Sequence, residues 1–166
     1  MRPRRLPAFS YVGCQRYFLT LCAFERRRHF VLADAIAAIH AEFLRTSADC
    51  WFEILAYCFM PDHVHLLVEG MSDRSDLTAF VPTAKQRAAH VARQSIHGRL
   101  WQAGYFERVL RDDDDTINVA RYVVQNPVRA GLVRSPGEYL FLGSSILSKE
   151  DLIGSCVWTP RMRGGP

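Results

Sequence analysis

The sequence predicts an α+β domain in which helices pack mainly on one face of an antiparallel sheet. Three observations lead to this class. Apolar patterns follow in the order strand, helix, strand, strand, helix, strand, helix, which is typical of split β-α-β units. Two of the strand patterns are joined by a short turn, so we expect them to pair antiparallel. With 166 residues, 49 % of them hydrophobic, the chain can bury the core of one domain.

The first half of the chain supplies one strand, one helix and a hairpin. Residues 16–24 are rich in aromatic and β-branched side chains and predict a buried strand. Apolar residues recur at helical spacing over residues 30–44 and predict an amphipathic helix. Residues 51–59 and 63–69 predict two strands around the turn at residues 60–62.

The second half supplies two helices and one strand. Residues 76–97 predict a helix that is broken near Pro82 and ended by Gly98. Residues 105–111 alternate as a strand does. The next helix is expected to end at about Asn126, because Pro127 follows. Further on, the pattern is less regular: residues 140–142 fit a strand or a loop, and residues 149–156 fit a short helix.

We expect three regions: a basic N-terminal arm at residues 1–13, one domain at residues 14–142, and a partly disordered extension at residues 143–166. No apolar run approaches the ~20 residues of a membrane span. Five cysteines without a Cys-x-x-Cys pair are typical of a reducing compartment. We therefore expect a cytoplasmic protein.

The charge of the chain permits nucleic-acid binding without requiring it. The formal net charge is +4 and the pI is near 8.9. Arginine stands at every basic position except Lys85 and Lys149, and its planar guanidinium suits phosphates and base edges. A GC-rich genome explains the same arginine preference without any function.

Two histidines in the second strand of the hairpin are candidate metal ligands. Side chains alternate along a strand, so His63 and His65 project from one face and Val64 from the other. Two imidazoles one pleat apart can hold a single metal ion. The alternative is that both histidines are structural residues beside a core strand.

A second candidate pair lies about sixty residues later. Tyr122 and Asn126 are four apart in a predicted helix and share one face, together with Asn118. On a helical projection the apolar residues lie on the opposite side. We expect that buried stripe to comprise Ile117, Ala120 and Val124. Three other tyrosines lie in strand-like apolar runs and are expected in the core: Tyr17, Tyr57 and Tyr105.

These residues resemble the HUH single-tyrosine transposases. His63-Val64-His65 is similar to their histidine-hydrophobe-histidine motif. The segments RYVVQNPVRAGLV (121–133), LWQAGYFER (100–108) and RDDDD (111–115) resemble the REP-associated branch of that family. The resemblance covers roughly residues 9–142, and the two-part signature is specific where a bare His-x-His is not.

The resemblance implies a ferredoxin-like palm with the histidines on a central strand and the tyrosine on a following helix. It implies that His63, His65 and Asn126 bind Mg²⁺ or Mn²⁺, with Gln125 as a rival for the third ligand. Imidazole suits Mn²⁺ better than Mg²⁺. Tyr122 is then the nucleophile that forms a 5′-phosphotyrosine and frees a 3′-hydroxyl.

Other residues are secondary candidates. Lys85, Arg87, Arg93 and Arg129 are candidate contacts to DNA, although a solvated surface explains each equally well. Trp101 is a candidate for stacking on bases or for packing. Aspartates 112–115 precede a helix, where acidic side chains normally cap the N-terminus and interact with the helix dipole rather than bind metal.

The predicted function is metal-dependent nicking and strand transfer on single-stranded hairpin DNA. The resemblance to the REP-associated branch implies a monomer rather than a homodimer. One tyrosine attacks one phosphate and needs a free strand, and no recognition helix for duplex DNA is evident. Two alternatives stay open: a binding module of the same fold that recognises structured nucleic acid without cleaving it, and an HUH replication initiator or relaxase.

Overall fold

The computed structural model describes residues 9–111 and 113–156. Its centre is a five-stranded sheet in the order β4-β1-β3-β2-β5, and every neighbouring pair is antiparallel. The α+β class and the antiparallel sheet are confirmed. The strands are β1 (Arg16–Cys22), β2 (Phe52–Met60), β3 (His63–Gly70), β4 (Phe106–Leu110) and β5 (Leu142–Gly143).

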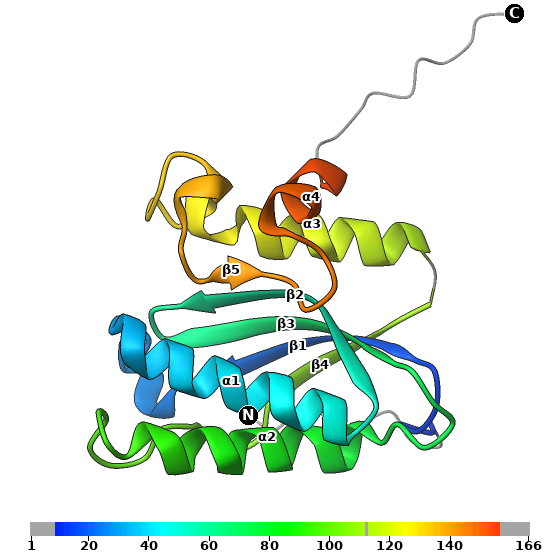
Figure 1. Cartoon of the computed structure of the whole chain (residues 1–166), viewed down its shortest axis with the longest axis horizontal. Helices are drawn as coiled ribbons and strands as arrows, with labels where there is room; N and C mark the ends of the chain where they lie inside the picture. The colour runs from blue at the N-terminus through cyan, green and yellow to red at the C-terminus, as the bar shows by residue number, and fades with distance from the viewer. Residues whose placement is uncertain (1–8, 112, 157–166) are drawn as a thin grey trace, which may run out of the picture.

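Helices lie on both sides of this sheet (Figure 1). Helices α1 and α2 lie together on one face, and α3 and the short α4, which the sequence also predicted as helices, lie on the other. Two 3-10 turns, η1 (Phe24–Arg26) and η2 (Pro136–Glu138), lie in the connections. The helices are α1 (Ala33–Asp49), α2 (Leu77–Ala92), α3 (Asp113–Arg129) and α4 (Lys149–Ser155).

The first face of the sheet forms the larger core. Alternate residues of β1, β2 and β3 are fully buried there against large side chains of α1 and α2. Burial of this apolar surface is the main stabilising contribution to the domain. This core includes Leu19, Leu21, Ile54, Phe59, Val64, Leu66, Val68, Phe43 and Phe80.

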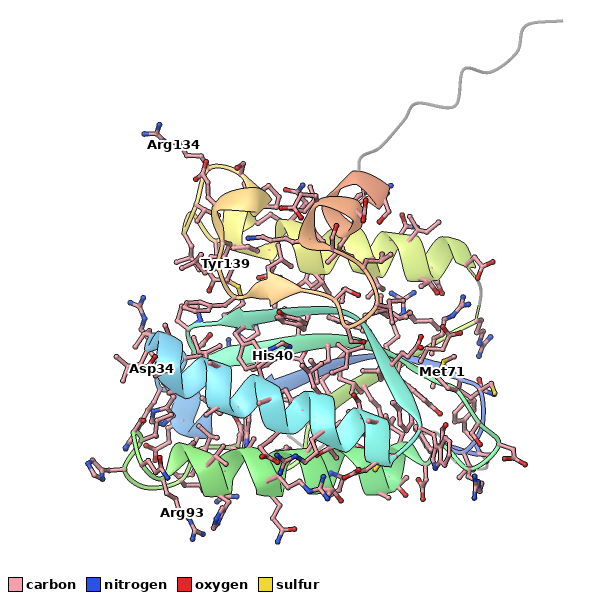
Figure 2. All side chains as sticks on the ribbon, viewed as in Figure 1. Asp34, His40, Met71, Arg93, Arg134 and Tyr139 are labelled. Atoms are coloured by element: carbon pink, nitrogen blue, oxygen red, sulfur yellow. The ribbon has the colours of Figure 1, made fainter. Side chains whose placement is uncertain are left out.

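The second face forms a smaller core beneath α3 and α4. It contains Leu67 of β3 together with Val119, Val123 and Val124 of α3. Tyr139 lies in this core, and its hydroxyl donates to the carbonyl of Phe59 at 2.6 Å. Figure 2 labels Tyr139 on the side of the sheet opposite α1 and α2. The segment after α3 is thereby tied to β2.

Two predicted helix breaks were wrong. Pro82 lies inside α2, on its exposed side, where the carbonyl that loses its amide partner can face water. Pro127 lies inside α3, which continues to Arg129. Because Pro127 is buried, its packing offsets the hydrogen bond that its missing N–H removes.

The ends of the domain also differ from the prediction. Tyr11, within the expected N-terminal arm, is buried and stacks on Tyr17. The rest of that arm up to residue 8, and residues 157–166 of the extension, lie outside the described residues. In the described part of the chain, none of the helices combines the length and apolar character needed to cross a bilayer.

Candidate active site

The hairpin of β2 and β3 positions the two histidines. Val64 of β3 is fully buried toward α1 and α2, whereas His63 and His65 project from the face that α3 covers, as the alternation predicts. His65 is only 4 % exposed, and its ring stacks on Phe18 of β1 at 5.2 Å between centroids.

The two imidazoles converge on one point. Their Nε2 atoms are 3.0 Å apart, and each Nδ1 atom faces away from that point toward a partner of its own. Nδ1 of His63 lies 2.6 Å from Oδ1 of Asp62, and Nδ1 of His65 lies 3.0 Å from Oγ1 of Thr20. Asp62 is held in turn by Arg26, whose Nε lies 2.8 Å from its Oδ2.

This arrangement fixes the direction of at least one unprotonated imidazole lone pair. A carboxylate only accepts hydrogen bonds, so His63 carries its proton on Nδ1 and presents a bare Nε2. The Thr20 hydroxyl can accept or donate, so His65 can also present a bare Nε2. Carboxylate or hydroxyl partners of this kind orient histidine ligands in metal sites.

Burial keeps both imidazoles neutral. It lowers the pKa of His63, against the opposing effect of Asp62. It lowers the pKa of His65 to about 3, and the neighbouring His63 adds to the effect. Because metal ions bind the unprotonated nitrogen, both histidines are in the binding form at neutral pH.

The spacing of the histidine nitrogens fits a shared ion. Two ligand atoms at right angles around an octahedral ion, each about 2.1 Å from it, are separated by about 3 Å. The two Nε2 atoms are 3.0 Å apart, at which distance one ring can also donate a hydrogen bond to the other. Within the described ranges, no cluster of three or more His, Cys, Asp and Glu side chains forms a complete site. Within these ranges, a further protein ligand to such an ion would be of another type, such as an amide oxygen.

Helix α3 brings Tyr122 to the histidines. The Tyr122 ring lies edge-on to His65 at 5.4 Å between centroids and to Phe18 at 5.7 Å. It is 38 % exposed, so the residue is partly open to solvent. The guanidinium carbon of Arg129 lies 5.3 Å from the centre of the same ring. The structure therefore joins the two sequence candidates, the histidine pair and the tyrosine, in one site.

The predicted apolar stripe of α3 was partly wrong. Ile117 is 46 % exposed, and Val119 and Val123 are buried in its place with Val124. The separation of Tyr122 from the buried stripe still holds, because the true stripe also leaves Tyr122 at its margin.

Asn126 lies one helical turn beyond Tyr122 and is half-buried. Among the described residues its side chain forms no hydrogen bond, so the amide oxygen is available to a ligand. Among the described residues, no hydrogen bond joins it to His63 or His65. Its role as a third ligand, and that of Gln125 as a rival, stay predictions.

Two of the secondary candidates are structural. Nζ of Lys85 donates to the carbonyls of Gln102 and Gly104 at 2.8 and 2.6 Å. Trp101 is 5 % exposed and donates its indole N–H to the carbonyl of Lys85 at 3.0 Å. A buried indole cannot stack on a base, so the stacking role predicted for Trp101 was wrong.

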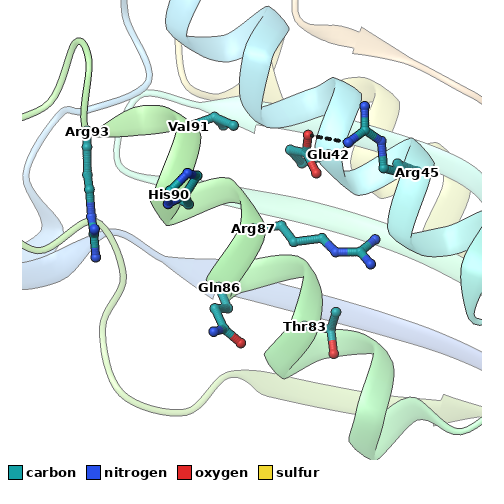
Figure 3. Close-up of a pocket in the computed structure, with 8 residues that line it drawn as sticks. All are labelled: Glu42, Arg45, Thr83, Gln86, Arg87, His90, Val91 and Arg93. Atoms are coloured by element: carbon teal, nitrogen blue, oxygen red, sulfur yellow. Dashed lines mark ion pairs between the residues drawn. The ribbon is translucent and has the colours of Figure 1, made fainter.

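Arg87 and Arg93 lie on the wrong face for the active site. They line an open groove of about 510 Å³ between α1 and α2 (Figure 3), on the side of the sheet opposite α3. Arg87 is paired there with Asp49 at 2.6 Å, and Arg45 of the same groove is paired with Glu42 at 3.4 Å. Figure 2 places Arg93 below α2, far from Tyr139. Neither arginine contacts the histidines or Tyr122.

The acidic run before α3 forms ion pairs. Asp113 binds Arg16, which also donates to Glu69 at 2.8 Å. Asp115 pairs with Arg108 at 2.9 Å. Asp112 and the Asp114 side chain lie outside the described part. The two described side chains thus fasten the start of α3 to β1 and β4 and lie apart from the histidine pair.

The rival tyrosines are part of the first core or its margin. Tyr17 is fully buried, and burial raises its pKa. The Tyr57 ring packs on His40 at 4.2 Å, and Tyr105 packs against the same core. Tyr122 is the tyrosine that the structure places against the histidine pair.

Three supporting residues escaped the sequence-based search: Asp62, Thr20 and Arg26. Asp62 had a local signal, since it directly precedes His63. Thr20 could be found only from the register of β1 with β3, in which it stands opposite His65. Arg26 reaches Asp62 from η1, a turn with positive φ at Glu25 and Arg26 that the local sequence did not predict.

The fold and sequence both match known transposases. The chain is 27 % identical over 128 residues to a candidate REP-associated tyrosine transposase of Haemophilus influenzae, which covers 70 % of this chain and 72 % of that protein. It is 25 % identical over 138 residues to the REP-associated tyrosine transposase of Escherichia coli, covering 79 % and 77 %.

Two solved structures share the fold. One is a REP-associated tyrosine transposase bound to a REP hairpin, with a TM-score of 0.71, 21 % identity and coverage of 86 % of this chain and 81 % of that one. The other is a candidate transposase of Deinococcus radiodurans, with a TM-score of 0.51, 17 % identity and coverage of 72 % and 95 %. The sequence model of the family described as "Transposase IS200 like" matches residues 14–126, from before β1 to Asn126. With the histidine pair and Tyr122 inside the matched region, the chain belongs to the IS200-like transposase family, whose members are enzymes that act on DNA.

Proposed function

We propose that this transposase nicks and rejoins single-stranded DNA through a covalent bond to Tyr122, with the help of a divalent metal. The observation that carries the proposal is the contact between the Tyr122 ring and His65 at 5.4 Å. His65 belongs to a pair of neutral imidazoles aimed at one point. The proposed nucleophile and the proposed cation ligands thus lie side by side.

Cleavage follows from the chemistry of the phenol. Oη of Tyr122 attacks the phosphorus of the scissile phosphate and loses its proton. The new P–O bond forms as the bond from phosphorus to the 3′ oxygen breaks, and that oxygen leaves as a 3′-hydroxyl after taking up a proton. Attack by a free 3′-hydroxyl on the phosphotyrosine reverses these steps, rejoins a strand and restores the tyrosine.

The phenol needs assistance because a tyrosine with an ordinary pKa of about 10 is a weak nucleophile at neutral pH. When bound, Mg²⁺ or Mn²⁺ would supply Lewis-acid stabilisation of the negative charge that develops on the phosphate during attack. We assign His63, His65 and Asn126 as the residues that hold the ion. Asp62 and Thr20 keep the two imidazole rings oriented toward it.

We further propose that the substrate is single-stranded DNA that contains a hairpin. Support comes from the relative with the same fold that is bound to a REP hairpin. It also comes from the accessibility of Tyr122, which is 38 % exposed at the margin of α3. The proposed unit is a monomer, in which all four site residues come from one chain.

A covalent-adduct assay tests the proposal. The protein is incubated with Mn²⁺ and single-stranded DNA that carries a hairpin and a label on the 3′ side of the expected cut. We expect a labelled protein band in a denaturing gel, lost on addition of a chelator and absent with Tyr122→Phe. Binding without an adduct under all metal conditions would favour the alternative of a non-cleaving binding module.

A further inference from the structure

The sheet face that carries the histidines is only partly covered. Helix α3 packs mainly on β2 and β3, where Leu67 is buried beneath Val123 and its neighbours. At the β4 edge of the same face, Phe106 is 52 % exposed. An apolar ring is therefore open to solvent on the side of the active site away from β2.

Strand register places Phe106 in the row of the histidine. Thr20 of β1 stands opposite His65 of β3 in one ladder and opposite Phe106 of β4 in the other. Residues directly opposite each other in antiparallel strands project from the same face. Because neighbouring strands are about 4.8 Å apart, the backbone of Phe106 lies about 10 Å from that of His65.

The surroundings of Phe106 are polar and cationic. Thr20 fills the position between the ring and His65. Arg108, two residues along β4, projects from the same face with a side chain that is 53 % exposed, although Asp115 pairs with it. Arg129 lies beyond, over the ring of Tyr122. An exposed aromatic ring with an arginine beside it on the same strand face suits a nucleic-acid strand, whose bases have π-faces and whose phosphates are anionic.

We propose that Phe106 is a stacking platform for an unpaired base close to the scissile phosphate. The inference rests on the proposed function, because a base reaches this corner when the strand passes Tyr122. Stacking on a ring tolerates any base, so Phe106 positions the strand without reading its sequence. The short Phe106–Thr20–His65 row sets the distance from the stacked base to the metal-binding histidines.

Binding without cleavage tests this role separately from catalysis. In chelator, we measure the Kd for a labelled hairpin with single-stranded flanks by fluorescence anisotropy. Loss of one stacked base typically weakens binding by about tenfold, so we expect Phe106→Ala and Phe106→Leu to weaken it to that extent. Phe106→Trp should restore it. Phe106→Leu keeps apolar bulk in the strand but removes the π-face, and circular dichroism confirms that each variant is folded.

Trp51 offers a matched control. It is 50 % exposed and directly precedes β2, at the end of the hairpin away from His63. Trp51→Ala should leave the Kd unchanged. In a further experiment, an abasic site is placed at each position of the single-stranded flanks in turn. At one position it should weaken DNA binding by the wild type but not weaken binding by Phe106→Ala any further.

The outcomes separate this inference from the proposed function. Unchanged binding by Phe106→Ala and Phe106→Leu, with an adduct still formed by the wild type, overturns the stacking role alone. Weakened binding by both variants without any wild-type adduct supports the platform and refutes cleavage. If the wild type self-associates on gel filtration and the Phe106 variants do not, while DNA binding is unchanged, this sheet edge binds a second copy of the chain. That result would overturn the proposal.

Discussion

Replacing Asp62 by alanine removes the acceptor that orients His63. Asp62 receives Nδ1–H of His63 at 2.6 Å and is itself held by Arg26 at 2.8 Å. Without this acceptor, the ring can rotate and its proton can move to Nε2, the atom that we assign to the metal. Removal of such a partner typically weakens metal affinity by about 10- to 100-fold.

We therefore expect Asp62→Ala to raise the Kd for Mn²⁺ by about 10- to 100-fold, measured by calorimetry on the protein without DNA. Asp62→Asn keeps an acceptor oxygen and should lose much less Mn²⁺ affinity than Asp62→Ala. Arg26→Ala leaves the bond between Asp62 and His63 in place and serves as a second control. Unaltered Mn²⁺ affinity in Asp62→Ala, in a protein that remains folded, would refute the orienting role.

Two further predictions concern stability. The folded pKa of His65 lies at about 3, below its unfolded value, so between about pH 6.5 and pH 3 the unfolded state binds more protons and stability falls as the pH falls. From this group we expect the free energy of unfolding, measured with urea in chelator, to be about 2 kcal/mol lower at pH 5 than at pH 7. His65→Gln should reduce that difference. An equal difference in the variant would contradict the lowered pKa of His65. Val123→Ala, at a fully buried position of α3, should cost about 2 kcal/mol in the same assay, whereas the exposed Ile117→Ala should cost under about 0.5 kcal/mol; the reverse order would contradict the observed orientation of α3.

Local patterns predicted the parts of the site that depend on one element. Alternation along residues 63–69 placed His63 and His65 on the face away from Val64, and helical spacing kept Tyr122 off the buried stripe. These predictions hold because the period of a strand or helix is set by its own backbone.

Features that depend on contacts between distant segments were not predictable in this way. Thr20 supports His65 through the pairing of β1 with β3, and Trp101 is buried by packing of a loop onto the first core. From the sequence alone, either Ile117 or Val123 could belong to the buried stripe of α3, since both are apolar and β-branched. The side on which the sheet lies decides in favour of Val123.

The two prolines show the same limit. Each lacks one hydrogen bond, which locally favours a helix end. In α3 the burial of Pro127 outweighs that loss, and burial is a property of the assembled domain.

The most direct test of the account is the identity of the residue that bonds to DNA. After reaction with Mn²⁺ and a single-stranded hairpin substrate, the adduct is digested and the nucleotide-bearing peptide is sequenced by mass spectrometry. The account predicts a phosphodiester on Tyr122, no adduct with Tyr122→Phe, and unchanged hairpin binding by that variant in chelator. An adduct on another tyrosine such as Tyr105, or cleavage that persists in Tyr122→Phe, would contradict it.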